Sequence, residues 1–214
     1  MEFIDPELDQ YVHRHSEAES DLLNDLNRET YLKVLQPRML SGHVQGRILS
    51  MYSKLIRPER ILEIGTYTGY SAICLAEGLT DGGTLDTIEK NEELLPIINR
   101  YVERAGLSDK IKLHIGNALP IIESMDATFD LVFIDADKTN YLNYYEAVFP
   151  KMKSGGCIIA DNALWSGKVL DEKELKNDPD TRVLDEFNKA VTADKRVDNV
   201  LLPVRDGLMV VIKK

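Results

Sequence analysis

The sequence predicts an α/β fold in which helices cover both faces of a doubly wound, mostly parallel sheet of seven strands. After Pro58, short apolar runs alternate with longer stretches of helical periodicity. Such βαβ alternation is typical of a parallel sheet. Near the end of the chain, two apolar runs meet at Asp206-Gly207, a pair that suits a tight turn with positive φ. The last strand is therefore expected to close a hairpin and to run antiparallel to its neighbour.

The residues before the sheet are predicted to form extra N-terminal helices. From about Asp5 to Arg57 the pattern is helical and no strand pattern interrupts it. The letters SEAE, from Ser16 to Glu19, form a capping box, so a helix is expected to open there. A chain of 214 residues, 43% of them hydrophobic, suits one domain, with helices in residues 1–57 and the core in 58–214.

The core elements follow one another in a regular order. Strands are expected at residues 60–65, 83–89, 110–116, 129–136 and 155–161, before the final hairpin. Helices are expected at residues 68–79, 91–106, 138–152 and 179–192, with a short one before Phe129. Pro96 is expected to disturb the first turns of the second of these helices.

Composition narrows the class of partner. The net charge of -10 gives no general attraction for polyanions, so nucleic acid or an anionic membrane would need a local basic patch. The first residues lack the basic head of a secretory signal, and no apolar run approaches the roughly 20 residues of a membrane span. A cytoplasmic protein is expected. Cys74 and Cys157 lie in apolar surroundings and are expected to be buried, reduced thiols.

A first ligand site is predicted where the first strand meets its helix. Gly65 and Gly69 lie in this connection, where a doubly wound sheet binds its ligand. Glu63 would repel a pyrophosphate but attract an ammonium group, and Glu89 ends the second strand, where a carboxylate can accept two ribose hydroxyls. Together they indicate S-adenosylmethionine (SAM). Alternatively, the glycines only permit a tight turn and Glu89 caps the next helix.

A second site is predicted at the ends of the fourth and fifth strands. Asp135 follows the fourth strand, and Asp161 with Asn162 follows the fifth. Neighbouring parallel strands lie roughly 5 Å apart, so these side chains can converge at the carboxyl edge of the sheet. Two carboxylates and an amide oxygen suit Mg²⁺, or Mn²⁺ and Ca²⁺ less specifically, whereas zinc would favour His or Cys. Alternatively, the aspartates cap a helix and form an ordinary turn.

Lys138 begins the helix three residues after Asp135, so its amine can fold back over the same site. A lysine near a divalent cation is easier to deprotonate and could take a proton from a substrate hydroxyl. A solvated lysine is the alternative. Asp137 points away from Asp135 in an extended chain and is expected to cap the helix or support the site.

These motifs resemble those of the cation-dependent, SAM-dependent O-methyltransferases, the group that contains catechol and caffeoyl-coenzyme A O-methyltransferases, in its plant and bacterial branch. The similarity runs from about Met39 to the C-terminus, through LEIGTYTGYS, FIDADKTNY, IIADNALWSGKV and the final DGL. It implies a Rossmann-like core, methyl transfer that leaves S-adenosylhomocysteine (SAH), and a homodimer.

The resemblance also implies roles for individual residues. Metal ligands would be Asp135, Asp161 and Asn162, with Lys138 as the base and Asp135 counted as catalytic and close to the cofactor. Cofactor contacts would be Met39, Glu63, Gly65, Tyr67, Ser71, Glu89 and Ala118. Trp165 would line the acceptor pocket, unless it is a hydrophobic plug. His43 could line that pocket or lie on the surface, and His13, His15 and His114 suggest no site.

The predicted reaction is methyl transfer from SAM to a hydroxyl of a metal-chelated, catechol-like phenolic small molecule. The main alternative acceptor is a hydroxyuridine of tRNA, reached through a basic entrance made of Arg38, Arg47 and Lys168, although the acidic composition argues against it. A nucleotide-binding dehydrogenase and a non-catalytic binding module fit the motifs less well. The N-terminal helices could form a dimer interface or fold over the acceptor pocket.

Overall fold

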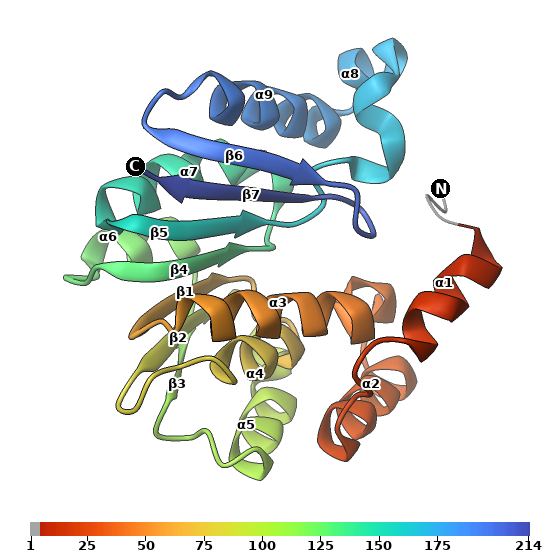
Figure 1. Cartoon of the computed structure of the whole chain (residues 1–214), viewed down its shortest axis with the longest axis vertical. Helices are drawn as coiled ribbons and strands as arrows, with labels where there is room; N and C mark the ends of the chain where they lie inside the picture. The colour runs from red at the N-terminus through yellow and green to blue at the C-terminus, as the bar shows by residue number, and fades with distance from the viewer. Residues whose placement is uncertain (1–4) are drawn as a thin grey trace. The chain divides into compact units, whose positions relative to one another are not determined.

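The computed structural model describes residues 5–214, whose contacts divide into two compact units, residues 5–117 and 118–214 (Figure 1). A single domain divided at residue 57 stays a prediction. Strands of the first unit follow the order β3-β2-β1, and those of the second the order β4-β5-β7-β6. All pairs within the units are parallel except those of β7, which is antiparallel to both β5 and β6. These seven strands confirm the predicted mostly parallel sheet with an antiparallel end.

The first unit is formed by N-terminal helices and three strands. Its strands are β1 (Arg60–Ile64), β2 (Thr84–Glu89) and β3 (Ile111–Ile115). Its helices are α1 (Pro6–Arg14), α2 (Asp21–Lys33), η1 (Pro37–Met39), α3 (Gly42–Ile56), α4 (Tyr70–Ala76), η2 (Glu92–Leu94) and α5 (Leu95–Arg104). Figure 1 shows α3 and α4 side by side, and apolar residues of α4 are buried. The predicted order of strands and helices is confirmed.

The expected helix start at Ser16 is wrong. The hydroxyl of Ser16 donates to the carbonyl of Val12, so this serine belongs to the end of α1. Helix α2 opens four residues later, where the Ser20 hydroxyl accepts the backbone N–H of Leu23 at 3.3 Å. Leu23 is buried, so the helix begins where capping and burial of its apolar face coincide.

Pro96 has the expected local effect. Glu92–Leu94 form a 3₁₀ turn, and α5 begins at Leu95 with Pro96 in its first turn. A proline is tolerated there because the first N–H groups of a helix have no intrahelical acceptor.

The second unit carries the other four strands and the C-terminal helices. Its strands are β4 (Phe129–Ile134), β5 (Met152–Ala160), β6 (Val197–Leu202) and β7 (Leu208–Lys213). Its helices are α6 (Ala118–Ser124), η3 (Lys138–Asn140), α7 (Tyr141–Val148), η4 (Phe149–Lys151), η5 (Trp165–Leu170), α8 (Glu172–Asn177) and α9 (Pro179–Ala193). Figure 1 shows α9 alongside β6. The sequence did not predict η5 and α8.

The hairpin is present, but its turn is longer than expected. Residues 203–207 connect β6 to β7, and positive φ angles fall at Arg205 (48°) and Gly207 (91°), not at Asp206. The physical reason is that Asp206 and Gly207 bond to the segment after β5, as described below, and so do not close a two-residue turn. Within residues 5–214, no helix is both long and apolar enough to cross a lipid bilayer.

Candidate functional site

The connection between β1 and α4 is a tightly folded loop that lies across the end of β2. The backbone N–H groups of Gly65 and Thr66 both donate to the carbonyl of Ile88, at 3.0 and 3.2 Å. Positive φ angles occur at Gly65 (99°), Tyr67 (51°) and Gly69 (90°). Glycine has no Cβ to clash in this region, which explains two of the three positions. Ser71, in the first turn of α4, is buried.

Glu89 organises the same loop. One carboxylate oxygen accepts the N–H of Tyr67 at 2.8 Å, and the other accepts those of Lys90 and Asn91 at 2.8 and 2.7 Å. The alternative that Glu89 caps the next helix is wrong, because the N-cap of η2 is Asn91, whose side chain accepts the N–H of Glu93. A carboxylate has about four lone-pair positions, so the three hydrogen bonds to Glu89 leave capacity for one ligand hydroxyl.

Glu63 and Met39 lie in very different surroundings. Glu63 is fully buried in β1 and accepts a hydrogen bond from the hydroxyl of Thr87, on the paired strand, at 2.5 Å. Met39 is 58% exposed. The hydroxyl of Tyr67 donates to the carbonyls of Leu35 and Gln36, which ties the segment before Met39 to the glycine loop. Ala118 is the first residue of α6, in the other unit.

The register of β4 and β5 places the predicted metal ligands after paired residues. Ile134 pairs with Ala160, and the N–H of Asp161 donates to the carbonyl of Ile134 at 2.9 Å. Asp135 and Asp161 therefore follow the same pair of residues. The Asp161 residue is only 4% exposed and the Asp135 side chain is 21% exposed. We call Asp135, Asp161 and Asn162 the acidic edge.

Asn162 adopts a left-handed backbone conformation, with φ of 59°. Its N–H donates to the carboxylate of Asp161 at 2.7 Å, and its side-chain nitrogen donates to the carboxylate of Asp206 at 3.3 Å. Within the part of the chain that the structure describes, no three His, Cys, Asp or Glu side chains gather as a metal cluster. The acidic edge contains only two such residues, because its third member is an amide.

Lys138 folds back over the acidic edge as the spacing predicts. Its ammonium lies 3.1 Å from the Asp135 carboxylate and donates to the hydroxyl oxygen of Tyr141 at 2.7 Å. It also lies 4.8 Å from the centre of the Tyr141 ring and 6.0 Å from that of Trp165. The side chain is 11% exposed, so the alternative of a solvated lysine is wrong.

Tyr141 is a site residue that the sequence reasoning did not single out. It is fully buried, and its hydroxyl donates to the carbonyl of Ile134 at 3.4 Å. Burial, together with the negative charges of Asp135 and Asp161, raises the pKa of Tyr141 well above its ordinary value. The phenol therefore stays protonated and presents its oxygen to Lys138. Its position three residues after Lys138, on the same helical face, was the available signal.

Asp137 supports this region through side chains. Its carboxylate accepts hydrogen bonds from the Tyr144 hydroxyl and the Asn140 amide, both at 2.5 Å. Burial raises the pKa of Asp137, but these hydrogen bonds outweigh it and leave the pKa below its ordinary value. The predicted supporting role agrees with these contacts.

Comparison with known proteins identifies the family. A family model described as O-methyltransferase matches residues 13–214. The chain belongs to the O-methyltransferase family. Caffeoyl-CoA O-methyltransferase from Petroselinum crispum is 38% identical over 180 residues, which cover 79% of this chain and 75% of that protein. The similarity to O-methyltransferases that the motifs predicted is thereby confirmed.

Solved O-methyltransferase structures share the fold over nearly the whole chain. The O-methyltransferase from Bacillus cereus, in complex with SAH, has a TM-score of 0.90 and 31% identity and covers 97% of each chain. TomG from Streptomyces achromogenes, in complex with SAM, has a TM-score of 0.90 and 26% identity, covering 97% of this chain and 96% of that one. The two compact units thus belong to a fold already known for O-methyltransferases.

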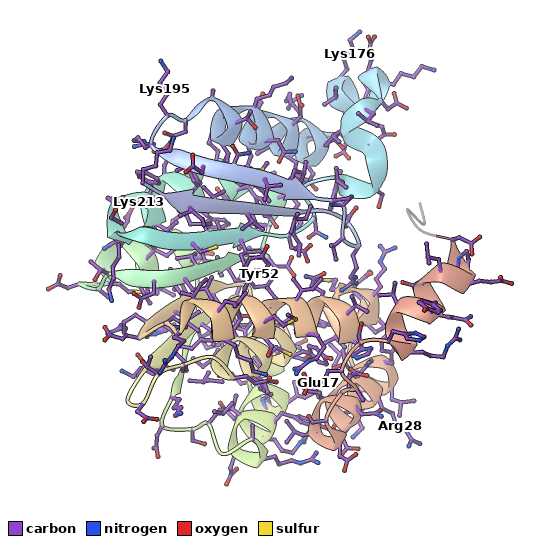
Figure 2. The ribbon with its side chains drawn as sticks, viewed as in Figure 1. Glu17, Arg28, Tyr52, Lys176, Lys195 and Lys213 are labelled. Atoms are coloured by element: carbon purple, nitrogen blue, oxygen red, sulfur yellow. The ribbon has the colours of Figure 1, made fainter. Side chains whose placement is uncertain are left out.

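Contacts in this O-methyltransferase alter two expectations about basic side chains. His13 and His43 do form a pair, with their Nδ1 atoms 3.0 Å apart, and the other nitrogen of His43 contacts the carbonyl of Glu17 at 2.5 Å. Figure 2 shows Glu17 in the connection between α1 and α2. The pair was missed because its members are 30 residues apart.

The proposed basic entrance is not a set of available charges. Arg47 is buried and donates to the carboxylate of Glu77 at 2.6 Å. Lys168 lies 3.1 Å from the carboxylates of both Glu174 and Asp178. Two of the three expected cations are therefore neutralised by partners within their own units.

Proposed function

We propose that this O-methyltransferase transfers a methyl group from SAM to one hydroxyl of a metal-chelated, catechol-like phenolic acceptor. The observation that carries the proposal is the contact of Lys138 with Asp135 at the acidic edge, with Asp161 following the paired residue of the neighbouring strand. These groups offer oxygen ligands for a cation and a nitrogen for a proton at one place.

The cofactor is proposed to be held by the first unit. The Glu89 carboxylate has capacity left to accept a ribose hydroxyl, and the loop from Gly65 to Gly69 places backbone beside it. Glu63 supplies negative charge for the ammonium of the methionine part. Met39, Tyr67 and Ser71 are proposed as further contacts of this unit, and the role of Ala118 stays a prediction. The SAH and SAM complexes of the Bacillus cereus enzyme and of TomG support this assignment.

The acidic edge fits a hard divalent cation, most simply Mg²⁺. Its donors are two carboxylates and one amide oxygen, the all-oxygen set that hard divalent cations prefer. Asp135, Asp161 and Asn162 would hold the ion. When bound, it supplies positive charge that lowers the pKa of an acceptor hydroxyl and a fixed point that orients a vicinal diol.

Lys138, as the neutral amine that this role requires, is proposed to receive the proton of the acceptor hydroxyl. Tyr141 holds its amine in place, because the protonated phenol accepts from Lys138 and donates to Ile134. As the proton moves to Nζ, an oxygen lone pair forms the bond to the methyl carbon, and the electrons of the carbon–sulfur bond remain on sulfur, leaving SAH. Holding the reactants in line contributes at most about 7–11 kcal/mol of the barrier reduction.

The names of the relatives and the pairing of the basic side chains support a small phenolic molecule as the methyl acceptor. Relatives at 38% identity are named caffeoyl-CoA O-methyltransferases, and the chelating diol of a catechol suits the acidic edge. Trp165 is proposed as a wall of the acceptor pocket, beside Lys138. Pairing of Arg47 and Lys168 removes the support for a tRNA entrance. A cytoplasmic homodimer remains an expectation.

Methyl transfer from labelled SAM tests the proposal directly. The acceptors are a panel of catechols and bulk tRNA, each with Mg²⁺ and with excess chelator. Transfer to a catechol that chelator abolishes is the expected result. Transfer only to tRNA would overturn the acceptor class, and transfer unaffected by chelator would overturn the metal.

Two variants test the assigned roles. Asp135→Ala should abolish chelator-sensitive turnover while leaving the SAH affinity within about twofold of wild type. Lys138→Ala should lower kcat by about 100-fold or more with little change in KM. Lys176→Ala is the matched control, because Lys176 extends from the end of α8 into solvent (Figure 2). A Lys138 variant with the control's kcat would remove the lysine as the base.

A further inference from the structure

The hairpin loop (residues 203–207) is hydrogen-bonded to the segment that follows β5. We call residues 162–167 the ligand loop. The N–H of Ala163 donates to the carbonyl of Gly207 at 3.0 Å, and that of Leu164 to the carbonyl of Asp206 at 2.8 Å. The carboxylate of Asp206 also accepts the N–H of Ser166 and the side-chain nitrogen of Asn162. Asp206 therefore makes three of the bonds that hold the ligand loop.

The backbone of the ligand loop needs such support. Positive φ angles occur at Asn162 (59°), Trp165 (46°), Ser166 (54°) and Gly167 (78°). A residue with a Cβ pays roughly 1–2 kcal/mol to adopt this region, and three of these four have one. Strained conformations persist only where the surrounding structure holds them, and they cluster at functional sites.

The contact with Asn162 also fixes the direction of its amide. An ionised carboxylate only accepts hydrogen bonds, so Asp206 must face the amide nitrogen of Asn162. The amide oxygen then lies on the opposite side of the group. Were position 206 unable to accept, the amide could turn and present N–H groups in place of its oxygen, which would repel a cation.

We infer that Asp206 is a positioning residue of the acidic edge. It turns the oxygen of Asn162 toward a bound divalent cation and, through Ser166, sets the loop that carries Trp165 beside Lys138. This inference rests on the proposed function, because it assumes that Asn162 is a metal ligand. It adds a residue 44 positions away in the sequence that touches no reacting group itself.

The close fit of the hairpin loop supports this role. At Gly207, with φ of 91°, a Cβ would lie 2.5 Å from Cγ and 2.8 Å from the backbone nitrogen of Leu164. Those distances are shorter than any normal contact of such atoms, so the hairpin loop lies directly against the ligand loop. A displacement of one loop must displace the other.

Mn²⁺ binding to the full chain, measured by electron paramagnetic resonance, tests the inference without turnover. Asp206→Asn keeps the shape of the side chain but has one acceptor oxygen for two donors. We expect it to weaken Mn²⁺ binding at least tenfold, with SAH affinity within twofold of wild type. Fluorescence of Trp165, the chain's only tryptophan, should show altered quenching by acrylamide.

A reciprocal exchange separates orientation from mere stability. In the double variant Asn162→Asp/Asp206→Asn, the new amide donates to the new carboxylate, so Mn²⁺ affinity should return to within about threefold of wild type. The control is Asp194→Asn. Asp194 also accepts hydrogen bonds, from Arg196 and Tyr145, but it is the C-cap of α9 and contacts neither loop in these bonds. Its substitution should therefore leave the Mn²⁺ affinity unchanged.

The outcomes are distinct. Mn²⁺ affinity of Asp206→Asn within twofold of wild type overturns the inference, and so does a double variant as weak as the single one. If wild type itself binds no Mn²⁺ at millimolar concentration, the metal of the proposed function is refuted and this role of Asp206 with it. Weakening by Asp206→Asn with recovery in the double variant establishes the positioning role.

Discussion

The most informative single substitution in the cofactor half of the site is Glu89→Gln. The Glu89 carboxylate accepts three backbone N–H groups, one from Tyr67 on one oxygen and two from Lys90 and Asn91 on the other. A glutamine has a single acceptor oxygen and two N–H donors. The variant should keep the two bonds on one side and place its NH₂ group against the N–H of Tyr67.

The expected magnitude follows from the lost bond. A hydrogen bond to a charged group contributes about 1.5–3 kcal/mol, and the donor left behind is only partly buried, so unfolding should become easier by about 2 kcal/mol. For a chain of this length, that corresponds to a fall in Tm of roughly 4–8 °C. Loss of the ribose contact should weaken SAH binding by about 10–100-fold, or about 1.4–2.7 kcal/mol.

Calorimetric titration with SAH and thermal unfolding measure the two effects on the same samples. Glu103→Gln is the control, because Glu103 is an exposed glutamate of α5 in the same unit. A fall in stability with unchanged SAH affinity would refute the ribose contact and leave Glu89 as a support of the loop. Unchanged stability would refute the hydrogen-bond reasoning itself.

Three further predictions concern the surrounding framework. Burial raises the pKa of Glu77, but hydrogen bonds from Arg47 and its neighbours outweigh it and hold the pKa at about 2 rather than 4.5. After allowance for solvent screening, the free energy of unfolding of wild type should fall by about 1–2 kcal/mol relative to that of Glu77→Gln as pH falls from about 5 to 2. An equal change in both proteins, measured by urea unfolding across that range, would contradict this. Gly207→Ala should cost about 2 kcal/mol or more, from strain at positive φ and contact with Leu164, and an unchanged urea midpoint would count against that contact. Asp178→Ala removes the carboxylate that accepts the Trp165 indole N–H at 3.4 Å. The fluorescence emission of Trp165 should therefore shift to longer wavelength, and the KM for the phenolic substrate should rise. The same emission spectrum in both proteins would show that Asp178 does not position the ring.

The order of the elements was predictable because it depends on local patterns. The apolar strand runs and the helical spacing lie within stretches of 5 to 15 residues, and the structure confirms each of them in sequence order. The acidic edge could be anticipated for a related reason. Residues that end neighbouring parallel strands must meet at one edge of a sheet, so Asp135 and Asp161 could be paired from the strand assignments alone.

Local signals failed where two of them competed. Ser16 and Ser20 both suit the start of a helix. The helix begins after Ser20, which places Leu23 and Leu26 on its buried face. The sequence did not predict η5 and α8, which lie between β5 and α9. Trp165 and Ser166 have positive φ angles although neither is a glycine, so the residue types did not indicate this backbone conformation.

By itself, the sequence determined the strand and helix order, the family, and the residue types that could hold SAM and a cation. Only the tertiary structure decided which side chains fix those residues in place. The contact of Asp206 with Asn162, and those of the Tyr67 hydroxyl with the carbonyls of Leu35 and Gln36, depend on how separate elements pack. Hydrogen bonds of this kind act over about 3 Å in space, whatever the separation in the chain, so no periodicity records them.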